Sequence, residues 1–227
     1  MTAAFVVLAG GRGTRFGAGL NKVYLPMAGR PVLAWSFVWA RQVPGIETFV
    51  LVTHPDDREH AESVLRAELP GLAVEIVDGG ASRHASERAA VRRLAGRVRA
   101  GELEVVAVQD GARPLARPRL IEAVLAEAAA TGGAVPAVAA GNLWPPPDRR
   151  LVRVQTPQAF RAGPLVDAFE AADAAGFEGT DTCATVERFT DVPVRAVRSD
   201  DTNLKVTYPG DVERAETLLS ETVYDST

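Results

Sequence analysis

Cysteine is nearly absent from the sequence, with Cys183 as the single example. One thiol cannot form a disulfide within the chain and cannot build a cysteine-rich zinc site. No apolar run approaches the roughly 18 residues that a membrane helix needs. The first residues, up to Leu8, lack the basic segment that opens a secretory signal. These absences predict a cytoplasmic protein whose thiol stays reduced.

An excess of positive charge is also missing. The chain has 29 acidic and 25 basic residues, a net charge of -4. A protein that binds nucleic acid by neutralising phosphates usually has the opposite balance. We therefore expect neither nucleic acid nor a membrane as a partner, and any basic site must be local. With 227 residues and 47% hydrophobic content, the chain can bury one sizeable core, which predicts a single domain over residues 1–227.

Short β-branched runs alternate with longer segments of helical period. This pattern predicts an α/β fold with a doubly wound, mostly parallel sheet of Rossmann-like type and helices on both faces. The expected strands are residues 5–8, 48–53, 74–77, 105–108, 134–138, 151–154 and 194–197. The expected helices are residues 32–41, 55–68, 84–95, 118–130, 163–174, 181–189 and a last helix from 209.

The regular pattern stops after the fifth expected strand. Residues 139–150 contain the run Pro145-Pro146-Pro147, and proline cannot donate the hydrogen bonds of a sheet. This stretch therefore predicts a short protruding arm.

Ligands of such sheets bind beyond the carboxyl ends of the strands. The loops after the first, third, fourth and fifth strands should therefore share one rim. Residues 9–22 are glycine-rich and basic, residues 78–86 contain Arg83, and residues 109–114 contain Asp110 and Arg113. These three charged loops are expected to converge on one site.

Glycines dominate the first loop, Ala9-Gly10-Gly11-Arg12-Gly13-Thr14-Arg15-Phe16-Gly17. Backbone N–H groups without neighbouring Cβ atoms can approach a polyphosphate closely, although an ordinary tight turn stays possible for glycines alone. Two other phosphate loops are rejected by spacing, because Phe16 replaces the last glycine of a dinucleotide loop and no Gly-Lys-Ser/Thr follows. Two cations, Arg15 and Lys22, could stabilise the charge that builds on phosphorus during in-line displacement.

This loop, with Lys22 and Gly29-Arg30-Pro31-Val32-Leu33, resembles the signature of sugar-phosphate nucleotidyltransferases. Four further segments are similar to the 2-C-methyl-D-erythritol 4-phosphate cytidylyltransferase family and its relative, ribitol-5-phosphate cytidylyltransferase. They are residues 79–86, 110–114, 155–160 and 203–207, the last followed by Pro209 and Asp211. The segments occur in the family's order over nearly the whole chain.

The resemblance implies a Rossmann-like nucleotidyltransferase fold and a reaction of CTP with a small polyol phosphate, with Mg²⁺ as cofactor and pyrophosphate leaving. The first-choice acceptor is 2-C-methyl-D-erythritol 4-phosphate, an isoprenoid precursor. The implied catalytic residues are Arg15 and Lys22. The implied nucleotide-binding residues are Ala9, Gly10, Gly11, Gly13, Gly80, Arg83 and Ser86. The implied acceptor-binding residues are Asp110, Arg113, Thr156, Lys205 and, across a homodimer, Arg149. Protein ligands of the metal stay unassigned.

The sequence departs from the family pattern in its short arm, which lacks an Asp-Thr-x-Lys-like element. Gln109 also replaces the usual histidine, Gly111 replaces an alanine, and Ala81 stands where an acidic residue is common. These positions bear on the acceptor, so another polyol phosphate such as ribitol 5-phosphate stays open. Two alternatives belong to other classes: a non-catalytic nucleotide-binding protein, and an oxidoreductase, which would need the missing glycine pattern.

Several residues have a simpler structural interpretation. Asp181 fits a helix cap, and Trp35 and Trp39 are spaced to pack on one helix face. Asp110, Arg113 and Lys205, taken alone, could be ordinary loop residues. The histidines lack metal-ligand spacing and are interpreted as surface residues: His54, His60 and His84.

Overall fold

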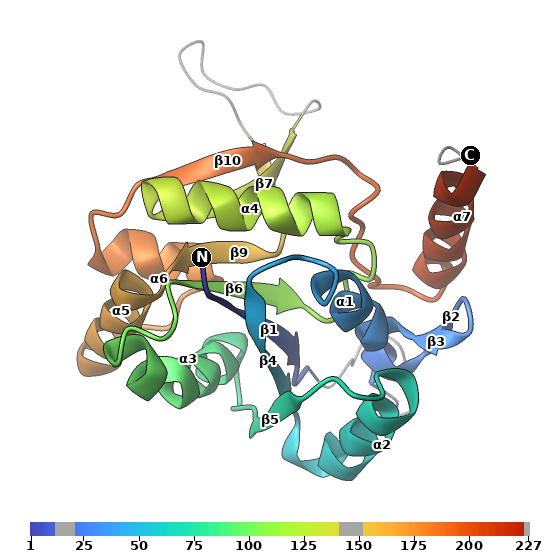
Figure 1. The fold of residues 1–227 in the computed structure, drawn as a ribbon, viewed down its shortest axis with the longest axis horizontal. Coiled ribbons are helices and arrows are strands. Elements are labelled where there is room, and N and C mark those ends of the chain that lie inside the picture. Colours follow the sequence, from blue (N-terminus) through green and yellow to red (C-terminus); the bar gives the residue numbers. More distant parts are fainter. Residues whose placement is uncertain (12–20, 141–151, 225–227) are drawn as a thin grey trace.

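The computed structural model describes residues 1–11, 21–140 and 152–224. Within these ranges the chain forms an eight-stranded sheet, a small hairpin and helices around them (Figure 1). The strands of the large sheet are β1 (Ala3–Ala9), β4 (Ile46–Thr53), β5 (Val74–Asp78), β6 (Val105–Asp110), β7 (Gly133–Ala139), β8 (Val152–Val154), β9 (Gln158–Arg161) and β10 (Val194–Arg198). The hairpin consists of β2 (Pro26–Met27) and β3 (Arg30–Pro31).

The helices follow the strands closely in chain order. They are α1 (Val32–Ala40), α2 (Arg58–Glu68), α3 (Arg83–Arg99), α4 (Pro118–Thr131), α5 (Ala162–Ala175), α6 (Thr182–Phe189) and α7 (Gly210–Tyr224), with 3-10 turns η2 (Lys22–Tyr24) and η3 (Pro55–Asp57). None of these described helices combines the length and apolar character needed to cross a bilayer.

The sheet order is β10-β7-β9-β6-β1-β4-β5, with β8 paired to β7. Strands β5, β4, β1 and β6 run parallel to one another, and β7 runs parallel to β10. Only β8 and β9 pair antiparallel in the described sheet. The mostly parallel α/β fold expected from the sequence is thus confirmed.

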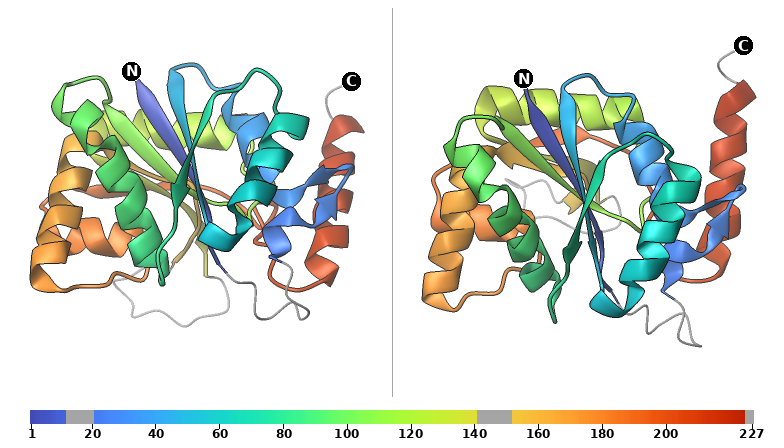
Figure 2. Two further views of the ribbon diagram at one scale, coloured as in Figure 1. Left: turned by 90° about the horizontal axis from the view of Figure 1, so that it is seen from below. Right: turned by 60° about the horizontal axis from the view of Figure 1, so that its bottom comes forward.

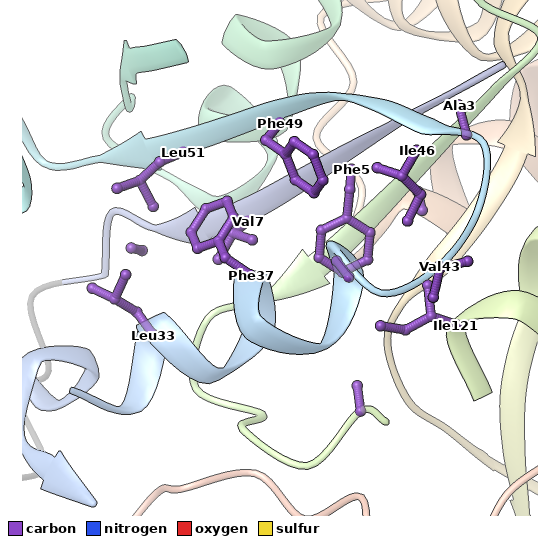
Figure 3. Packing of buried hydrophobic residues seen from close by; sticks show 14 of the residues in the cluster. Ala3, Phe5, Val7, Leu33, Phe37, Val43, Ile46, Phe49, Leu51 and Ile121 are labelled. Atoms are coloured by element: carbon purple, nitrogen blue, oxygen red, sulfur yellow. The ribbon is translucent and has the colours of Figure 1, made fainter. Parts of the chain in front are cut away.

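Each face of the sheet is covered by its own set of helices, as Figure 2 shows from two sides. Side chains alternate along a strand, so Phe5 and Val7 of β1 point to one face and Ala4 and Val6 to the other. The first face packs against α1, α2 and α4, and the second against α3, α5 and α6. Figure 3 shows Phe5 and Phe37 of α1 within the cluster on the first face, where the ring centroids of Phe37 and Phe49 lie 6.4 Å apart. Complete burial of such a side chain contributes about 2–3 kcal/mol.

A third apolar cluster lies at the end of the molecule where α7 meets the hairpin (Figure 1). Its buried members include Met27, Trp35, Val206 and Ala215. Trp35 stacks on Trp39 with ring centroids 5.4 Å apart, which confirms the packing expected from their spacing. The cluster therefore ties α7 and the segment before it to the hairpin and to α1.

The structure differs from the secondary structure expected from the sequence in two places. Strand β9 is not predicted, because its four residues begin and end with polar side chains and offer no period to detect. Helix α3 continues to Arg99 instead of ending at Ala95, since Val98 still packs on the second face. The expected arm, residues 139–150, lies outside the described residues except for its first two positions.

Candidate active site

A cavity of about 930 Å³ opens at the carboxyl ends of β1, β4, β5 and β6. Ala9, Gly10 and Gly11 line it after β1, and residues 79–83 line it after β5. Asp110 and Ala112 line it at the end of β6. Three of the four loops expected at one rim therefore meet there, and the fourth, after β7, lies outside the described residues. The loop after β4 adds His54 and Pro55, which the sequence patterns do not indicate.

The wall made by the β5–α3 loop requires glycine. Gly80 donates its backbone N–H to Oγ of Ser86 at 3.2 Å, and this hydroxyl donates to the carbonyl of Ser82 at 3.0 Å. A Cβ atom added to Gly80 would lie only 2.4 Å from Cβ of Ala85. The first turn of α3 therefore approaches the loop backbone closely, which leaves Gly80 and Ser86 at the cavity surface.

Lys22 lines the same cavity from the start of η2. The preceding residue, Asn21, is 7% exposed and donates from Nδ2 to the carbonyl of Ala9 at 2.8 Å and to Oδ2 of Asp57 at 3.1 Å. Its Oδ1 accepts the N–H of Val23 at 3.4 Å. Asn21 thus joins the end of β1 to η2 and sets the place from which Lys22 extends. Gly13 and Arg15 lie outside the described residues.

Only two of the 25 basic residues in the chain are lysines, Lys22 and Lys205. Both line the cavity. Lysine is a compact, mobile charge, whereas arginine has a planar fork of donors. The chain therefore has its two mobile point charges in one place, where a phosphate-bearing ligand could contact them.

Asp110 joins cations from two different segments. Its Oδ1 lies 3.2 Å from Nη2 of Arg83, and its Oδ2 lies 2.6 Å from Nζ of Lys205. Burial alone would raise the pKa of Asp110, but Lys205, Arg83 and Arg113 outweigh it and lower the pKa to about 2. The carboxylate is therefore ionised at any physiological pH and fixes both cations.

Two of the expected acceptor-binding residues stand behind Asp110 rather than on the wall of the cavity. Oγ1 of Thr156 accepts the backbone N–H of Asp110 at 3.0 Å, and the Thr156 side chain is buried. The guanidinium of Arg113 donates to the carbonyl of Asn203 at 2.6 Å. Both residues therefore support the segments that carry Asp110 and Lys205. Arg149 lies outside the described residues.

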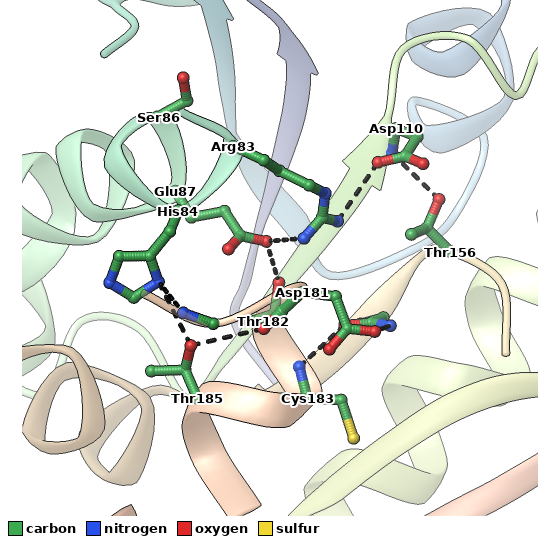
Figure 4. A network of polar contacts seen from close by, with 12 residues as sticks. Arg83, His84, Ser86, Glu87, Asp110, Thr156, Asp181, Thr182, Cys183 and Thr185 are labelled. Atoms are coloured by element: carbon green, nitrogen blue, oxygen red, sulfur yellow. Dashed lines mark hydrogen bonds and ion pairs between the residues drawn. The ribbon is translucent and has the colours of Figure 1, made fainter. Parts of the chain in front are cut away.

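His84 corrects an interpretation made from the sequence. It is 3% exposed, not a surface residue, and its ring stacks on Phe169 with centroids 5.1 Å apart. Its Nδ1 accepts the N–H of Gly179 at 3.3 Å, and burial lowers its pKa (Figure 4). Asp181, by contrast, is the expected cap, because its Oδ1 accepts the N–H of Ala184 at 2.8 Å.

The described residues contain no group of three or more His, Cys, Asp or Glu side chains that could hold a metal ion. Asp110 is the carboxylate of the cavity wall, and both of its oxygens already contact cations. Magnesium commonly keeps few protein ligands and rests on substrate phosphates instead. The described residues of the cavity therefore fit a metal that arrives with a nucleotide.

A mostly parallel sheet with a glycine-bordered cavity and two lysines at its carboxyl edge fits the nucleotidyltransferase class that the sequence resemblance implies. The model of the 2-C-methyl-D-erythritol 4-phosphate cytidylyltransferase family matches residues 3–221, and the chain belongs to this family. This confirms the resemblance and the enzyme class expected from the sequence.

Individual relatives agree with the family match. The enzyme of that name from Cereibacter sphaeroides is 45% identical, over 97% of this chain and 98% of its own. The one from Geobacillus kaustophilus is 33% identical, over 95% of this chain and 96% of its own. Among solved structures, the Thermus thermophilus enzyme is 29% identical, with a TM-score of 0.72 over 96% of this chain and 98% of its own. The 4-diphosphocytidyl-2C-methyl-D-erythritol synthase from Anaerococcus prevotii is 23% identical and shows the same fold, with a TM-score of 0.79 over 96% of both chains.

Proposed function

We propose that this cavity joins CTP to 2-C-methyl-D-erythritol 4-phosphate and releases pyrophosphate. The observation that carries the proposal is the meeting of Lys22, the Asp110–Lys205 pair and the glycine-bordered ends of β1 and β5 in one cavity. The cavity therefore offers separate places for a nucleotide and for a second, phosphorylated substrate. The 45% identical relative, which is named 2-C-methyl-D-erythritol 4-phosphate cytidylyltransferase, supports this assignment.

We assign to the nucleotide end Ala9, Gly10, Gly11, Gly80, Arg83 and Ser86, which line the cavity, and Gly13, which the sequence resemblance adds. Backbone groups and the Ser86 hydroxyl can contact a base and ribose at close range, because glycines border the wall. Lys22 and Arg15 are the cations assigned to the reacting phosphate. Their task is to stabilise the negative charge that grows on it in the transition state.

The acceptor end consists of Asp110 and Lys205, with Arg113 and Thr156 behind them and Arg149 as a further candidate from the arm. Ionised Asp110 can accept hydrogen bonds from polyol hydroxyls. Lys205 can hold the acceptor phosphate and turn one of its oxygens toward the nucleotide. Opposite charges therefore have different tasks within this end.

In the reaction, an oxygen of the acceptor phosphate attacks the α-phosphorus of CTP. The new P–O bond forms as the bond to the β-phosphate oxygen breaks, and pyrophosphate leaves with that electron pair. No protein nucleophile is required, because the attacking oxygen is already anionic. Positioning and charge stabilisation by the chain's own residues are therefore the main catalytic contributions.

We propose Mg²⁺ as the metal of this reaction. It would rest mainly on the nucleotide phosphates, beside the Asp110 carboxylate of the cavity wall, and would neutralise charge on the leaving pyrophosphate. The absence of a clustered metal site in the described residues is consistent with this arrangement.

A pyrophosphate-release screen tests the proposal directly. The four common nucleoside triphosphates are crossed with methylerythritol, ribitol, glycerol and hexose phosphates, with Mg²⁺ present or chelated. We expect release only with CTP, Mg²⁺ and the methylerythritol phosphate. Release with ribitol 5-phosphate instead would move the acceptor assignment. CTP binding without turnover on any acceptor would support a non-catalytic protein.

We further propose that the chain works as a homodimer. Val152 and Val154 lie on one face of β8 with 48% and 43% of their surface exposed, which is unusual for paired valines of a strand. Sedimentation equilibrium should give a mass twice that of one chain. The double variant Val152→Ser, Val154→Ser should give a mass closer to that of a single chain. A monomeric wild type would refute the homodimer.

The single domain and the cytoplasmic location stay predictions. Limited proteolysis tests the first, and cell fractionation tests the second.

A further inference from the structure

The side chain of Glu87 is completely buried beside the cavity, one helical turn after Arg83 on α3. Its Oε1 accepts hydrogen bonds from Nη1 of Arg83 and from Oγ1 of Thr182, each at 2.5 Å. Its Oε2 has no hydrogen-bond partner among the described residues. A buried carboxylate costs free energy unless its partners compensate. This arrangement therefore has a specific physical effect on Arg83.

Arg83 is held from two sides, as Figure 4 shows. Nη1 contacts Glu87 and Nη2 contacts Asp110, so the guanidinium plane is fixed between α3 and the end of β6. The Arg83 side chain is still 29% exposed and lines the cavity. Its position is between the nucleotide end and the acceptor end of the proposed site.

The charges alternate along this row: Glu87, Arg83, Asp110, Lys205. If the Glu87 charge were lost, Asp110 would be left to attract both cations alone. Arg83 would then move toward Asp110 and away from the orientation that Glu87 imposes. A contact between an arginine and a carboxylate is about twice as strong as one between neutral groups.

We infer that Glu87 is a positioning residue, whose carboxylate fixes the guanidinium of Arg83 where CTP and the acceptor phosphate meet. The inference rests on the proposed function. Glu87 does not reach the cavity surface itself, so it acts through Arg83.

The charged groups around Glu87 come from three elements. Arg83 lies on the same helix, Asp110 at the end of β6, and Asp181 at the start of α6. Burial raises the pKa of Glu87 to about 7, against the opposing effects of Arg83 and the Thr182 hydrogen bond. From α5, Asp173 faces α3 but pairs with Arg88 and Arg92. The Glu87 charge is therefore lost as the pH falls through about 7.

Glu87→Gln tests the inference, because glutamine keeps the shape and an acceptor oxygen but not the charge. We expect kcat/KM at pH 8 to fall about tenfold, as for the loss of one charge-assisted contact. The wild type should lose this advantage between pH 8 and 6, so the two proteins converge at the acid end. The substrate phosphates titrate in the same range, but equally for both proteins. Glu75→Gln is the matched control, since Glu75 also pairs with arginines of α3 but away from the cavity. It should leave the profile unchanged.

Two further variants separate positioning from general damage. Thr182→Val removes the hydrogen bond that lowers the pKa of Glu87, so the acid limb should move to higher pH. This variant also decides the question if Glu87→Gln does not fold. In an Arg83→Lys background, Glu87→Gln should add little further loss, because the partner on which it acts has changed. Full additivity, or an unchanged pH profile in both Glu87→Gln and Thr182→Val, would overturn the inference.

CTP affinity measured by calorimetry from pH 6 to 8 provides a readout that does not need turnover. We expect the wild type to bind CTP more weakly at pH 6, and Glu87→Gln to show only the change due to CTP itself. A wild type with this binding profile that releases no pyrophosphate would refute the proposed function and leave the role of Glu87 standing. An active wild type whose profiles match those of Glu87→Gln would do the reverse.

Discussion

The amide of Asn21 donates a 2.8 Å hydrogen bond to the carbonyl of Ala9, across the ends of the first loop. The two residues are twelve positions apart, yet this bond brings the end of β1 and the start of η2 together. Lys22 follows directly. The place of its ammonium group therefore depends on a neutral neighbour.

Replacing Asn21 should reduce turnover more than substrate binding. Asn21→Ala removes the bonds to Ala9, Asp57 and Val23 together, so we expect kcat to fall about tenfold or more, because small displacements of a catalytic group are costly. Steady-state pyrophosphate release gives kcat and KM separately. Asp57→Ala is the control, since it removes only the outer bond and should cost much less. Equal losses in the two variants would contradict this role for Asn21.

Replacing Lys22 itself should reduce turnover more than replacing Asn21 does. Lys22→Ala removes one preorganised charge, and such a loss costs on the order of 10²-fold or more in turnover. Lys22→Arg should recover only a part, because a planar fork cannot occupy the position of a point charge. Circular dichroism and thermal unfolding of both variants establish that the fold is retained. Wild-type turnover in folded Lys22→Ala would remove this residue from the mechanism.

The scarcity of lysine allows a labelling experiment. Trace acetylation should modify Lys22, Lys205 and the amino group of Met1, which lies at the opposite end of β1. With CTP at about ten times its dissociation constant, labelling of a covered amine should slow about tenfold. Mass spectrometry of digested protein reports all three amines in one sample. We expect protection of Lys22 and none of Met1, and equal labelling of Lys22 with and without CTP would argue against its contact with the nucleotide.

Two glycines near opposite ends of one helix segment should respond differently to alanine. Gly80→Ala places a Cβ atom 2.4 Å from Ala85, so the start of α3 must move and CTP binding should weaken by tenfold or more. Gly96 lies within α3 with open space around its Cα. Gly96→Ala should instead stabilise the protein by up to about 1 kcal/mol. Calorimetry with CTP and urea unfolding measure the two effects. Tight CTP binding by Gly80→Ala would contradict the close packing.

Glu87 should also give the stability of the protein a pH dependence. Its pKa rises from the ordinary value of 4.5 in the unfolded chain to about 7 in the folded protein. Between these pH values the folded chain holds a proton that the unfolded chain has lost. Stability from this group is present below pH 4.5 and is lost as the pH rises to about 7. Glutamine does not titrate, so the free energy of unfolding of Glu87→Gln does not fall in this way. Its excess over the wild type should therefore grow between pH 4.5 and 7, to on the order of 3 kcal/mol. Urea unfolding at pH 5, 6, 7 and 8 tests this. A constant difference would contradict it.

The parts of the fold that the sequence predicts are those with strong periods. Strand β1 is an apolar run before a cluster of glycines, so its existence is clear from the residues alone, although it extends from Ala3 to Ala9, beyond the predicted residues 5–8. Strand β9 is short and derives its pairing from β6 and β7, which lie far from it in sequence. Its position depends on tertiary contacts that no local pattern encodes.

The site divides in a similar way. Glycines and charged residues in loops after strands are visible in the sequence, and they predict Gly80, Lys22 and Asp110 at one rim. Glu87 also has a visible signal, its i,i+4 spacing from Arg83, but that spacing more often marks an exposed ion pair. Its burial depends on Thr182, which α6 brings from almost a hundred residues away. The sequence does not indicate Asn21, because its role depends on the hydrogen bond to the carbonyl of Ala9, and no local pattern predicts that bond.

The cluster at α7 has a consequence for how the protein is made. Chains grow from the N-terminus, so β1, Lys22 and the β5–α3 loop are complete long before Lys205 is added. The backbone N–H of Ala28 donates to Oε1 of Glu216 in α7 at 2.6 Å, so this contact can form only after α7 has been made. A growing chain can therefore assemble its nucleotide end early, whereas the acceptor end is finished only after Lys205 and then α7 have been made.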